Sequence, residues 1–390
     1  MKIVAAEVHT TFNLRLAHEL IMEGAWFEST VATNDTINSN TSEVRGELLY
    51  SYGERVFTAI CLLLFTITGT TGNSMVIIAV IFSRKLQTAT NVFVVSLATA
   101  DLLTNLFVFW NVVSLLSQDG WPLPNAHWLC VISGFMLFIC TCTSMYSLAA
   151  IALNRLILIT KPLPRYQHIF KPLHLGIMVA LTWIIPFSLC LALPLAGIGG
   201  FGYDKQQATC SDLDLHPKAD TFHLAQAITF YPIPLITIIA CYILIFRHVR
   251  QHLKKQRGQN EKLNTIKPTA FSSGVSSGPA SVDMEAVIAN KSDRKKKLMK
   301  MEIDITKNLF LVVCMFLLFM SPYFIALFIP GSDYFLLYGG IIVLANSTIN
   351  PVIYARRHPQ FKVVLGCMLK RRYADIPEPS LLLRKMLNKQ

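Results

Sequence analysis

The sequence predicts an all-α membrane protein, a bundle of seven transmembrane helices followed by a short amphipathic eighth helix. Two features of the composition support this fold class. Hydrophobic residues make up 53% of the 390 residues and charged residues only 15%, whereas a soluble domain carries about 25%. The charged residues are also clustered between long uncharged blocks, which is typical of a chain that crosses a bilayer repeatedly.

Seven blocks are apolar and long enough to cross a membrane, which takes about 20 helical residues. They fall near 55–82, 90–116, 127–159, 172–195, 222–246, 306–330 and 334–355. Several contain proline, which transmembrane helices tolerate because neighbouring side chains and waters satisfy the freed carbonyl groups. The predicted bundle covers residues 53–356, with a flexible loop at about 248–300 between the fifth and sixth spans.

Lysine and arginine predict the orientation, because short cytoplasmic loops carry an excess of them. The turns after the first and third spans are basic, as are the loop at 248–300 and the stretch after the seventh span. The opposite loops lean acidic. We therefore expect a multi-pass plasma-membrane protein with its N-terminus outside and its C-terminus in the cytosol. These loops account for the net charge of +12, so nucleic acid is not an expected partner.

The N-terminal segment, residues 1–52, is expected to be extracellular and glycosylated. It contains two acceptor sequences, at Asn34 and Asn40. Its first residues lack the continuous apolar core of a signal peptide, so we expect the first span to act as the signal anchor.

Two of the nine cysteines, Cys130 and Cys210, fall on the expected outer, oxidising side of the membrane. A disulfide between them would tie the loop before the fifth span to the start of the third span. Two free thiols are the alternative. Most of the other cysteines lie within spans, where a free cysteine packs as a small hydrophobic residue.

Polar residues at depth in several spans indicate an internal network. Asp101 lies in the second span and Arg155 ends the third, while Asn73 and Asn350 lie in the first and seventh. An ionisable group inside the membrane costs about 2.5–3.5 kcal/mol on insertion scales, so its presence favours a function. A purely structural cluster of interhelical hydrogen bonds is the alternative.

Ordered motifs along the spans resemble those of a known family. The motifs that carry the resemblance are "GN" in the first span, "LATADL" in the second, Cys130, "NRL" with Pro162, Trp183, Pro234 with Tyr242, Pro322 and "NPVIY". Their order and spacing over roughly residues 50–372 resemble those of the rhodopsin-like (class A) G-protein-coupled receptors. The resemblance implies a receptor that passes an external signal to a heterotrimeric G protein, and not an enzyme. A transporter is a weaker alternative, because no internal repeat is visible. So is a membrane enzyme, because the spans hold no paired carboxylates.

The resemblance also implies which residues act in activation. Asn154-Arg155-Leu156 stands where the family usually has Asp-Arg-Tyr, and neighbouring acids there hold the arginine in the inactive receptor. Asn154 lacks one such charge, so we predict basal activity, the alternative being that Asn154 holds Arg155 equally well by hydrogen bonding. The residues assigned to coupling and activation are Asn154, Arg155, Leu163, Tyr242, Glu302, Phe316, Asn350, Pro351 and Tyr354.

A sodium pocket is the one ion site that the resemblance implies, and no cofactor is expected. Its oxygen-bearing residues are Asp101, Ser144, Asn346, Ser347 and Asn350. Such oxygen ligands suit a hard cation.

The expected ligand pocket is apolar. Leu137 stands where amine receptors carry an aspartate, and Leu344 where opsins carry the lysine that binds retinal, which argues against both. Met320 replaces the usual tryptophan below the ligand. The predicted lining is Leu137, Phe138, Thr141, His223, Phe230, Met320, Tyr323 and Phe324. This set suits a neutral or lipid-like small molecule, with His223, Gln206 and Gln207 as candidate hydrogen-bonding partners. A peptide-responsive receptor is the alternative.

"NRL" together with "GFGYD" before the outer-loop cysteine is similar to melatonin receptors and related orphan receptors. The likeness is poor at the binding site, where Leu193 and Phe230 occupy positions that are polar in those receptors. It implies coupling to the inhibitory class of G protein.

After the seventh span, residues 357–372 are predicted to form an amphipathic helix on the membrane surface, with basic residues toward the lipid headgroups. Cys367 within it is a candidate for palmitoylation, a buried thiol being the alternative. Residues 373–390 form a cytoplasmic tail. The resemblance adds arrestin and receptor kinases as partners.

Overall fold

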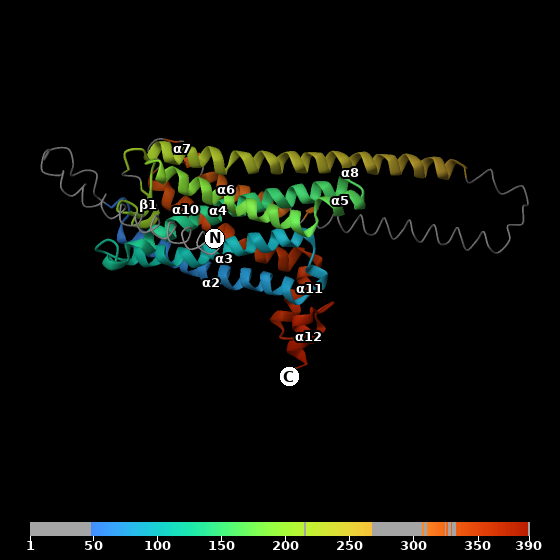
Figure 1. Ribbon diagram of the computed structural model, residues 1–390, viewed down its shortest axis with the longest axis horizontal. Helices are drawn as coiled ribbons and strands as arrows, with labels where there is room; N and C mark the ends of the chain where they lie inside the picture. The colour runs from blue at the N-terminus through green and yellow to red at the C-terminus, as the bar shows by residue number, and fades with distance from the viewer. Residues whose placement is uncertain are drawn as a thin grey trace, which may run out of the picture.

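The computed structural model describes residues 48–213, 216–266, 306–307, 310–323, 325–326, 329 and 333–388 (Figure 1). Asn34, Asn40, Glu302 and Phe324 lie outside this part of the chain, as do residues 1–47 and 267–305.

Long apolar helices make up the molecule. Six of those described are long and apolar enough to cross a membrane. They are α2 (Tyr52–Phe82), α3 (Ala89–Leu116), α4 (His127–Thr160) with the short η3 before it, α6 (Pro172–Leu195), α7 (Ala219–Phe230) continued by α8 (Pro232–Ile266), and α10 (Asp333–Arg357). An apolar helix at Phe310–Tyr323 lies within the predicted sixth span. The all-α membrane fold class predicted from the sequence is confirmed.

Shorter elements connect the long helices. They are η2 (Arg84–Leu86), η3 (Pro124–Ala126), α5 (Leu163–Ile169), the strands β1 (Phe201–Asp204) and β2 (Thr209–Asp212), α11 (Pro359–Leu369), η4 (Tyr373–Asp375) and α12 (Leu381–Leu387). The β1–β2 hairpin lies at one end of the bundle, here called the hairpin end. Helices α5 and α11 lie at the other, the α11 end (Figure 1).

The fifth span differs from its prediction in two ways. Its helix is interrupted at Tyr231, which separates α7 from α8, because Pro232 and Pro234 have no N–H groups to continue the hydrogen-bond ladder. It then extends to Ile266, well into the loop expected at 248–300. The stretch from Gln251 is rich in Lys, Gln, Glu and Leu, which favour helix even without burial.

The hairpin is an antiparallel pair in which Tyr203 lies opposite Cys210. Its turn is closed by Asp204, whose carboxylate accepts hydrogen bonds from the N–H groups of Gln206 and Gln207 at 2.8 Å each. Gly134 of α4 allows the hairpin to pack closely on that helix. A Cβ there would lie 2.9 Å from the carbonyl oxygen of Ser211, so a larger residue would push the hairpin away.

The distribution of apolar side chains is the reverse of that in a soluble protein, because large apolar side chains cover the outside of the bundle. Leu173, Ile236 and Leu318 are 72%, 65% and 64% exposed in the isolated chain. Buried polar side chains lie inside, among them Asn73, Asp101 and Asn350. This arrangement is the one expected where lipid surrounds the helices and polar groups must find partners internally.

Candidate functional site

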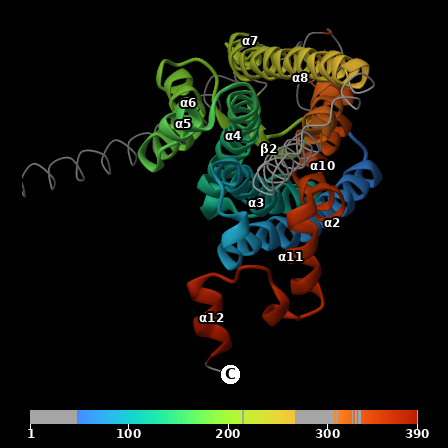
Figure 2. The same cartoon turned by 90° about the vertical axis from the view of Figure 1, so that its right-hand side faces the viewer.

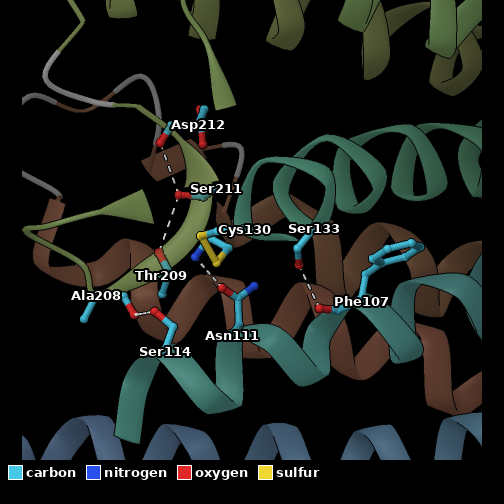
Figure 3. The surroundings of a disulfide bond; sticks show 10 residues. Phe107, Asn111, Ser114, Cys130, Ser133, Ala208, Thr209, Ser211 and Asp212 are labelled. Carbon is cyan, nitrogen blue, oxygen red and sulfur yellow. Dashed lines mark hydrogen bonds between the residues drawn. A yellow bond between two sulfur atoms is a disulfide. The ribbon is translucent and has the colours of Figure 1, made fainter. Parts of the chain in front are cut away.

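A disulfide joins Cys130, in the first turn of α4, to Cys210 of β2 (Figure 3). Two α3 side chains also hold the hairpin by its backbone. The amide oxygen of Asn111 accepts from the N–H of Cys210 at 2.5 Å, and the Ser114 hydroxyl donates to the carbonyl of Ala208 at 2.7 Å. The hairpin is thus fixed to two helices.

Beneath the hairpin lies a cavity of about 160 Å³. Seven of the residues predicted for the ligand pocket line it: Leu137, Phe138, Thr141, His223, Phe230, Met320 and Tyr323. Further aliphatic residues of its wall come mainly from α10, together with Leu62 of α2 and Leu115 of α3. Gln207 lines it as well. At its floor Met320 is buried, and Phe316 is buried one turn further along the same helix.

Six polar residues of the cavity wall were not predicted from the sequence: Thr58, Asn111, Thr209, Ser211, Asp212 and Gln226. The Asp212 carboxylate lies 2.6 Å from Nε2 of His223, which links β2 to α7 at the top of the cavity. Gln226 is 5% exposed, and its amide nitrogen has no hydrogen-bond partner among the described residues.

Periodicity could have found two of them. Gln226 lies three residues after His223, on the same face of a helix. Asp212 lies two residues after Cys210, on the same face of a strand. The cavity wall combines a mostly apolar surface with polar side chains, several of them from the hairpin and α7.

Deeper in the bundle the predicted polar network is assembled around Asp101. One carboxylate oxygen accepts from the hydroxyl of Ser144 at 2.9 Å, and the other accepts from the amide of Asn350 at 2.7 Å. Asn73 reaches the same region, where its amide donates to the carbonyl of Ser347 at 2.8 Å. The side-chain oxygens of Asn346 and Asn350 are buried and have no partner in the described part of the chain. Side-chain oxygens of this kind are the ligands that a hard cation prefers.

At the α11 end the structure assigns Asn154 a bridging role. Its carbonyl oxygen accepts from the hydroxyl of Thr90 at 2.6 Å, and its amide donates to the hydroxyl of Tyr166 at 3.2 Å. The side chain thus links α3, α4 and α5. Arg155 beside it is buried. Asn154 therefore forms hydrogen bonds with Thr90 and Tyr166. The comparison with Asp-Arg-Tyr did not predict this role.

Two further predicted switch residues surround this region. The hydroxyl groups of Tyr242 and Tyr354 are both buried, and neither has a hydrogen-bond partner among the described residues. Tyr354 stacks on Phe361 of α11, with ring centroids 5.5 Å apart. Leu163, at the start of α5, is 60% exposed, as expected of a residue offered to a partner.

The junction between α10 and α11 contains a histidine that sequence reasoning did not single out. His358 precedes α11, and its Nδ1 accepts from the N–H of Phe361 at 3.4 Å. Burial, and to a lesser extent the charge of Arg155, lowers the pKa of this imidazole to about 4. His358 is therefore neutral at physiological pH and caps α11.

A family model described as "7 transmembrane receptor (rhodopsin family)" matches residues 72–354. The chain belongs to the rhodopsin family of seven-transmembrane receptors. This receptor family is the class A family that the motifs resemble, and it is not a family of enzymes.

Relatives of this receptor include the melatonin receptor type 1C of Xenopus laevis, which is 29% identical over 53% of this chain and 50% of its own length. The Gq-coupled rhodopsin of Mizuhopecten yessoensis is 29% identical over 76% of this chain and 56% of its own length. The receptor thus spans about half the length of the curated relatives it matches. Among solved structures, squid rhodopsin aligns with a TM-score of 0.66 over 84% of this chain and 88% of its own, at 20% identity. That likeness concerns the fold.

Proposed function

We propose that this receptor binds a neutral, largely apolar small molecule under the hairpin and activates a heterotrimeric G protein at the α11 end. In this proposal the hairpin end is extracellular and the α11 end is cytosolic. The observation that carries it is the cavity. The surface of its wall is mostly apolar, and it lies beneath a covalently fixed hairpin.

The charges around the cavity favour a neutral ligand. Leu137 supplies no carboxylate for an amine, and the carboxylate of Asp212 is already bonded to His223. The amide nitrogen of Gln226 is a free donor, so it suits a ligand with a hydrogen-bond acceptor such as an amide or ether oxygen. Melatonin is a suitable first probe because curated relatives are named for it.

The test is nucleotide exchange on purified G proteins of the inhibitory, stimulatory and Gq classes, with receptor in lipid nanodiscs and a panel of neutral ligands. We expect Gln226→Leu to lower the potency of an active ligand about fivefold, because one neutral hydrogen bond contributes about 1 kcal/mol. Leu224→Ala is the matched control, since Leu224 lies on the same helix but is exposed on the outside of the bundle. Equal losses in the two variants would contradict this binding mode.

The same assay decides the G-protein class. Inhibitory coupling is the proposal, based on the melatonin-like resemblance, and exchange on Gq alone would overturn it. Arrestin and receptor kinases complete the proposed set of partners. Glycosylation at Asn34 and Asn40 and palmitoylation at Cys367 remain predictions.

Sodium regulation through Asp101 is part of the proposal. A cation bound among Asp101, Asn346 and Asn350 would favour the arrangement in which these oxygens converge, and so oppose activation. We expect sodium to lower basal exchange relative to an organic cation at equal ionic strength, and Asp101→Asn to abolish the difference. Ser96→Ala, which removes a buried hydroxyl bonded to Ser147 instead, is the control and should keep the sodium effect. Sodium sensitivity that survives Asp101→Asn would refute the assignment.

A further inference from the structure

The tail beyond α11 folds back onto the bundle. The chain turns at Arg371, forms η4, and bends through Glu378, which has a positive φ, to Ser380, the N-cap of α12. Residues 373–380 are here called the tail strap. The sequence predicts only a cytoplasmic tail at residues 373–390. The described part of that tail, through Asn388, is instead built against the end of α2 (Figures 1 and 2).

Backbone hydrogen bonds hold the tail strap to the α2–η2 junction. The N–H of Arg84 donates to the carbonyl of Glu378 at 2.9 Å, and the N–H of Ser380 donates to the carbonyl of Phe82 at 2.8 Å. Between them the Ser83 hydroxyl donates to the carbonyl of Pro377 at 2.7 Å. The strap therefore pairs with this junction as a short antiparallel bridge.

Apolar burial supports the pairing. Ile376 in the strap and Leu383 in α12 are each 2% exposed, and both join the core cluster that contains α2 and α11 residues such as Val80 and Val364. The rings of Tyr373 and Phe82 add an edge contact at 6.3 Å. The strap and α12 therefore share the apolar core of α2 and α11.

One side of α12, between the outward-facing Lys385 and the buried Leu383, is apolar and exposed. Leu382 and Met386 lie one helical turn apart and are 51% and 50% exposed, and Leu381 before them is 61% exposed. Basic residues surround this face. From Lys370 to Asn388 the chain carries five basic and two acidic residues, and one of the acidic residues, Asp375, is bonded to Arg372 at 2.5 Å.

α12 lies beside the bundle, at its α11 end. Viewed along the bundle axis, α12 lies outside the ring of helices, beyond α2 and α11 (Figure 2). Viewed from the side, it lies beside the α11 end and within the length of the bundle (Figure 1). The neighbouring surface of α2 also exposes Ile78 and Ile81, residues that face lipid in a transmembrane helix. The apolar face of α12 thus continues the lipid-facing surface of α2.

We propose that α12 is a second membrane anchor, which the tail strap positions so that Leu382 and Met386 insert into the inner leaflet while Arg384 and Lys385 contact anionic headgroups. This inference rests on the orientation given in the proposed function. A helix whose exposed apolar side is flanked by basic residues is the kind that lies in the membrane interface. A seven-residue helix is too short to be stable alone in water, so docking by the strap is what allows it to act.

The test places a nitroxide label at Leu382→Cys in full-length receptor. Cys61, Cys314 and Cys367 are changed to Ser, since the remaining free cysteines are buried. The receptor is placed in nanodiscs of phosphatidylcholine with and without phosphatidylserine. Accessibility of the label to oxygen, which concentrates in the bilayer, is compared with accessibility to a water-soluble nickel chelate. Asn388→Cys, at the C-cap of α12 and about 120° around the helix axis from Leu382, is the matched control.

We expect oxygen to dominate at position 382 and the nickel chelate to dominate at 388, with the difference larger when phosphatidylserine is present. Nickel dominance at both positions would overturn the proposal. A label at 382 that neither reagent reaches would also overturn it, because a protein surface would then cover α12.

A second variant tests the strap. Ile376→Asp places a charge in its buried contact and leaves α12 unchanged, so the label at 382 should become mobile and exposed to nickel, while Ile376→Val should preserve its oxygen preference. Insertion that persists in Ile376→Asp would remove the strap from the proposal. Nucleotide exchange on the same samples distinguishes failure of the proposed function from failure of the membrane-anchor inference. If the receptor activates a G protein while α12 stays in water, only the membrane-anchor inference is wrong. If α12 inserts but no nucleotide exchange occurs, only the proposed function is wrong.

Discussion

The two ends of the bundle are held by different kinds of interaction. At the hairpin end, the Cys130–Cys210 disulfide and the side chains of Asn111 and Ser114 fix the hairpin to α3 and α4. At the α11 end the links are noncovalent, and the buried hydroxyls of Tyr242 and Tyr354 lack partners among the described residues. The first end keeps a cavity in shape. The second can exchange one set of hydrogen bonds for another, which is what a conformational switch requires.

The largest expected effect is at the fixed end. Cys130→Ala opens a link between residues 80 positions apart, and the loss of such a disulfide costs about 2–5 kcal/mol. We expect loss of receptor from the cell surface, or loss of ligand response in any receptor that reaches it. Surface labelling and thermal inactivation of the detergent-solubilised protein measure both.

Cys190→Ala is the control for that change. Cys190 is a free, fully buried cysteine that packs with the apolar cluster around Phe222, so its loss leaves only a small cavity and costs about 1 kcal/mol. If the two variants lose the same amount of surface receptor, the disulfide is not what holds the hairpin end.

A smaller effect is expected where α10 meets α11. His358 has a pKa of about 4 in the folded receptor, against an ordinary value of 6.5, because it is buried and lies near Arg155. Below pH 6.5, His358 therefore takes up a proton in the unfolded chain, whereas in the folded receptor it is protonated only below about pH 4. The free energy of unfolding falls over this window by up to about 3 kcal/mol, and at neutral pH nothing is lost.

Thermal unfolding between about pH 7.5 and about pH 5 measures this contribution. His358→Asn keeps an acceptor at the start of α11 but removes the titrating group, so the drop in unfolding temperature should shrink. His168→Asn, an exposed residue on α5, should leave it unchanged. An identical pH response in all three proteins would show that His358 does not couple protonation to folding.

The sequence predicted what depends on composition and side-chain pattern. The spans and the disulfide partners follow from hydropathy and topology, and so does the carboxylate at Asp101. The tail strap could not be predicted, because the bonds from Arg84 and Ser380 join backbone atoms and leave no pattern in the side chains. The break at Tyr231 was signalled by two prolines, yet proline in a membrane helix is compatible with both a bend and a full interruption. Asp212 was visible as an acidic loop residue, but only its pairing with His223 places it in the cavity.

The smallest expected effect comes from placing an aspartate at position 154, beside Arg155. Asn154→Asp keeps both observed contacts, since a carboxylate accepts from Thr90 as the amide oxygen does and can accept from the Tyr166 hydroxyl once that group turns to donate. It adds a negative charge next to a buried arginine. We expect the inactive arrangement to gain about 1 kcal/mol, which lowers basal nucleotide exchange about fivefold.

Basal exchange without ligand, compared at equal surface expression, measures this effect, and Arg155→Ala should abolish the signal. Tyr166→Phe is the control that distinguishes charge from bridging, because it removes the contact from α5 without changing any charge near Arg155. If charge governs the switch, only Asn154→Asp lowers basal exchange. If Tyr166→Phe changes it as much, the switch depends on the bridge among α3, α4 and α5. A receptor in which Asn154→Asp has no effect while Arg155→Ala abolishes exchange would show that the amide, tied to Thr90 and Tyr166, holds this end as firmly as a carboxylate does.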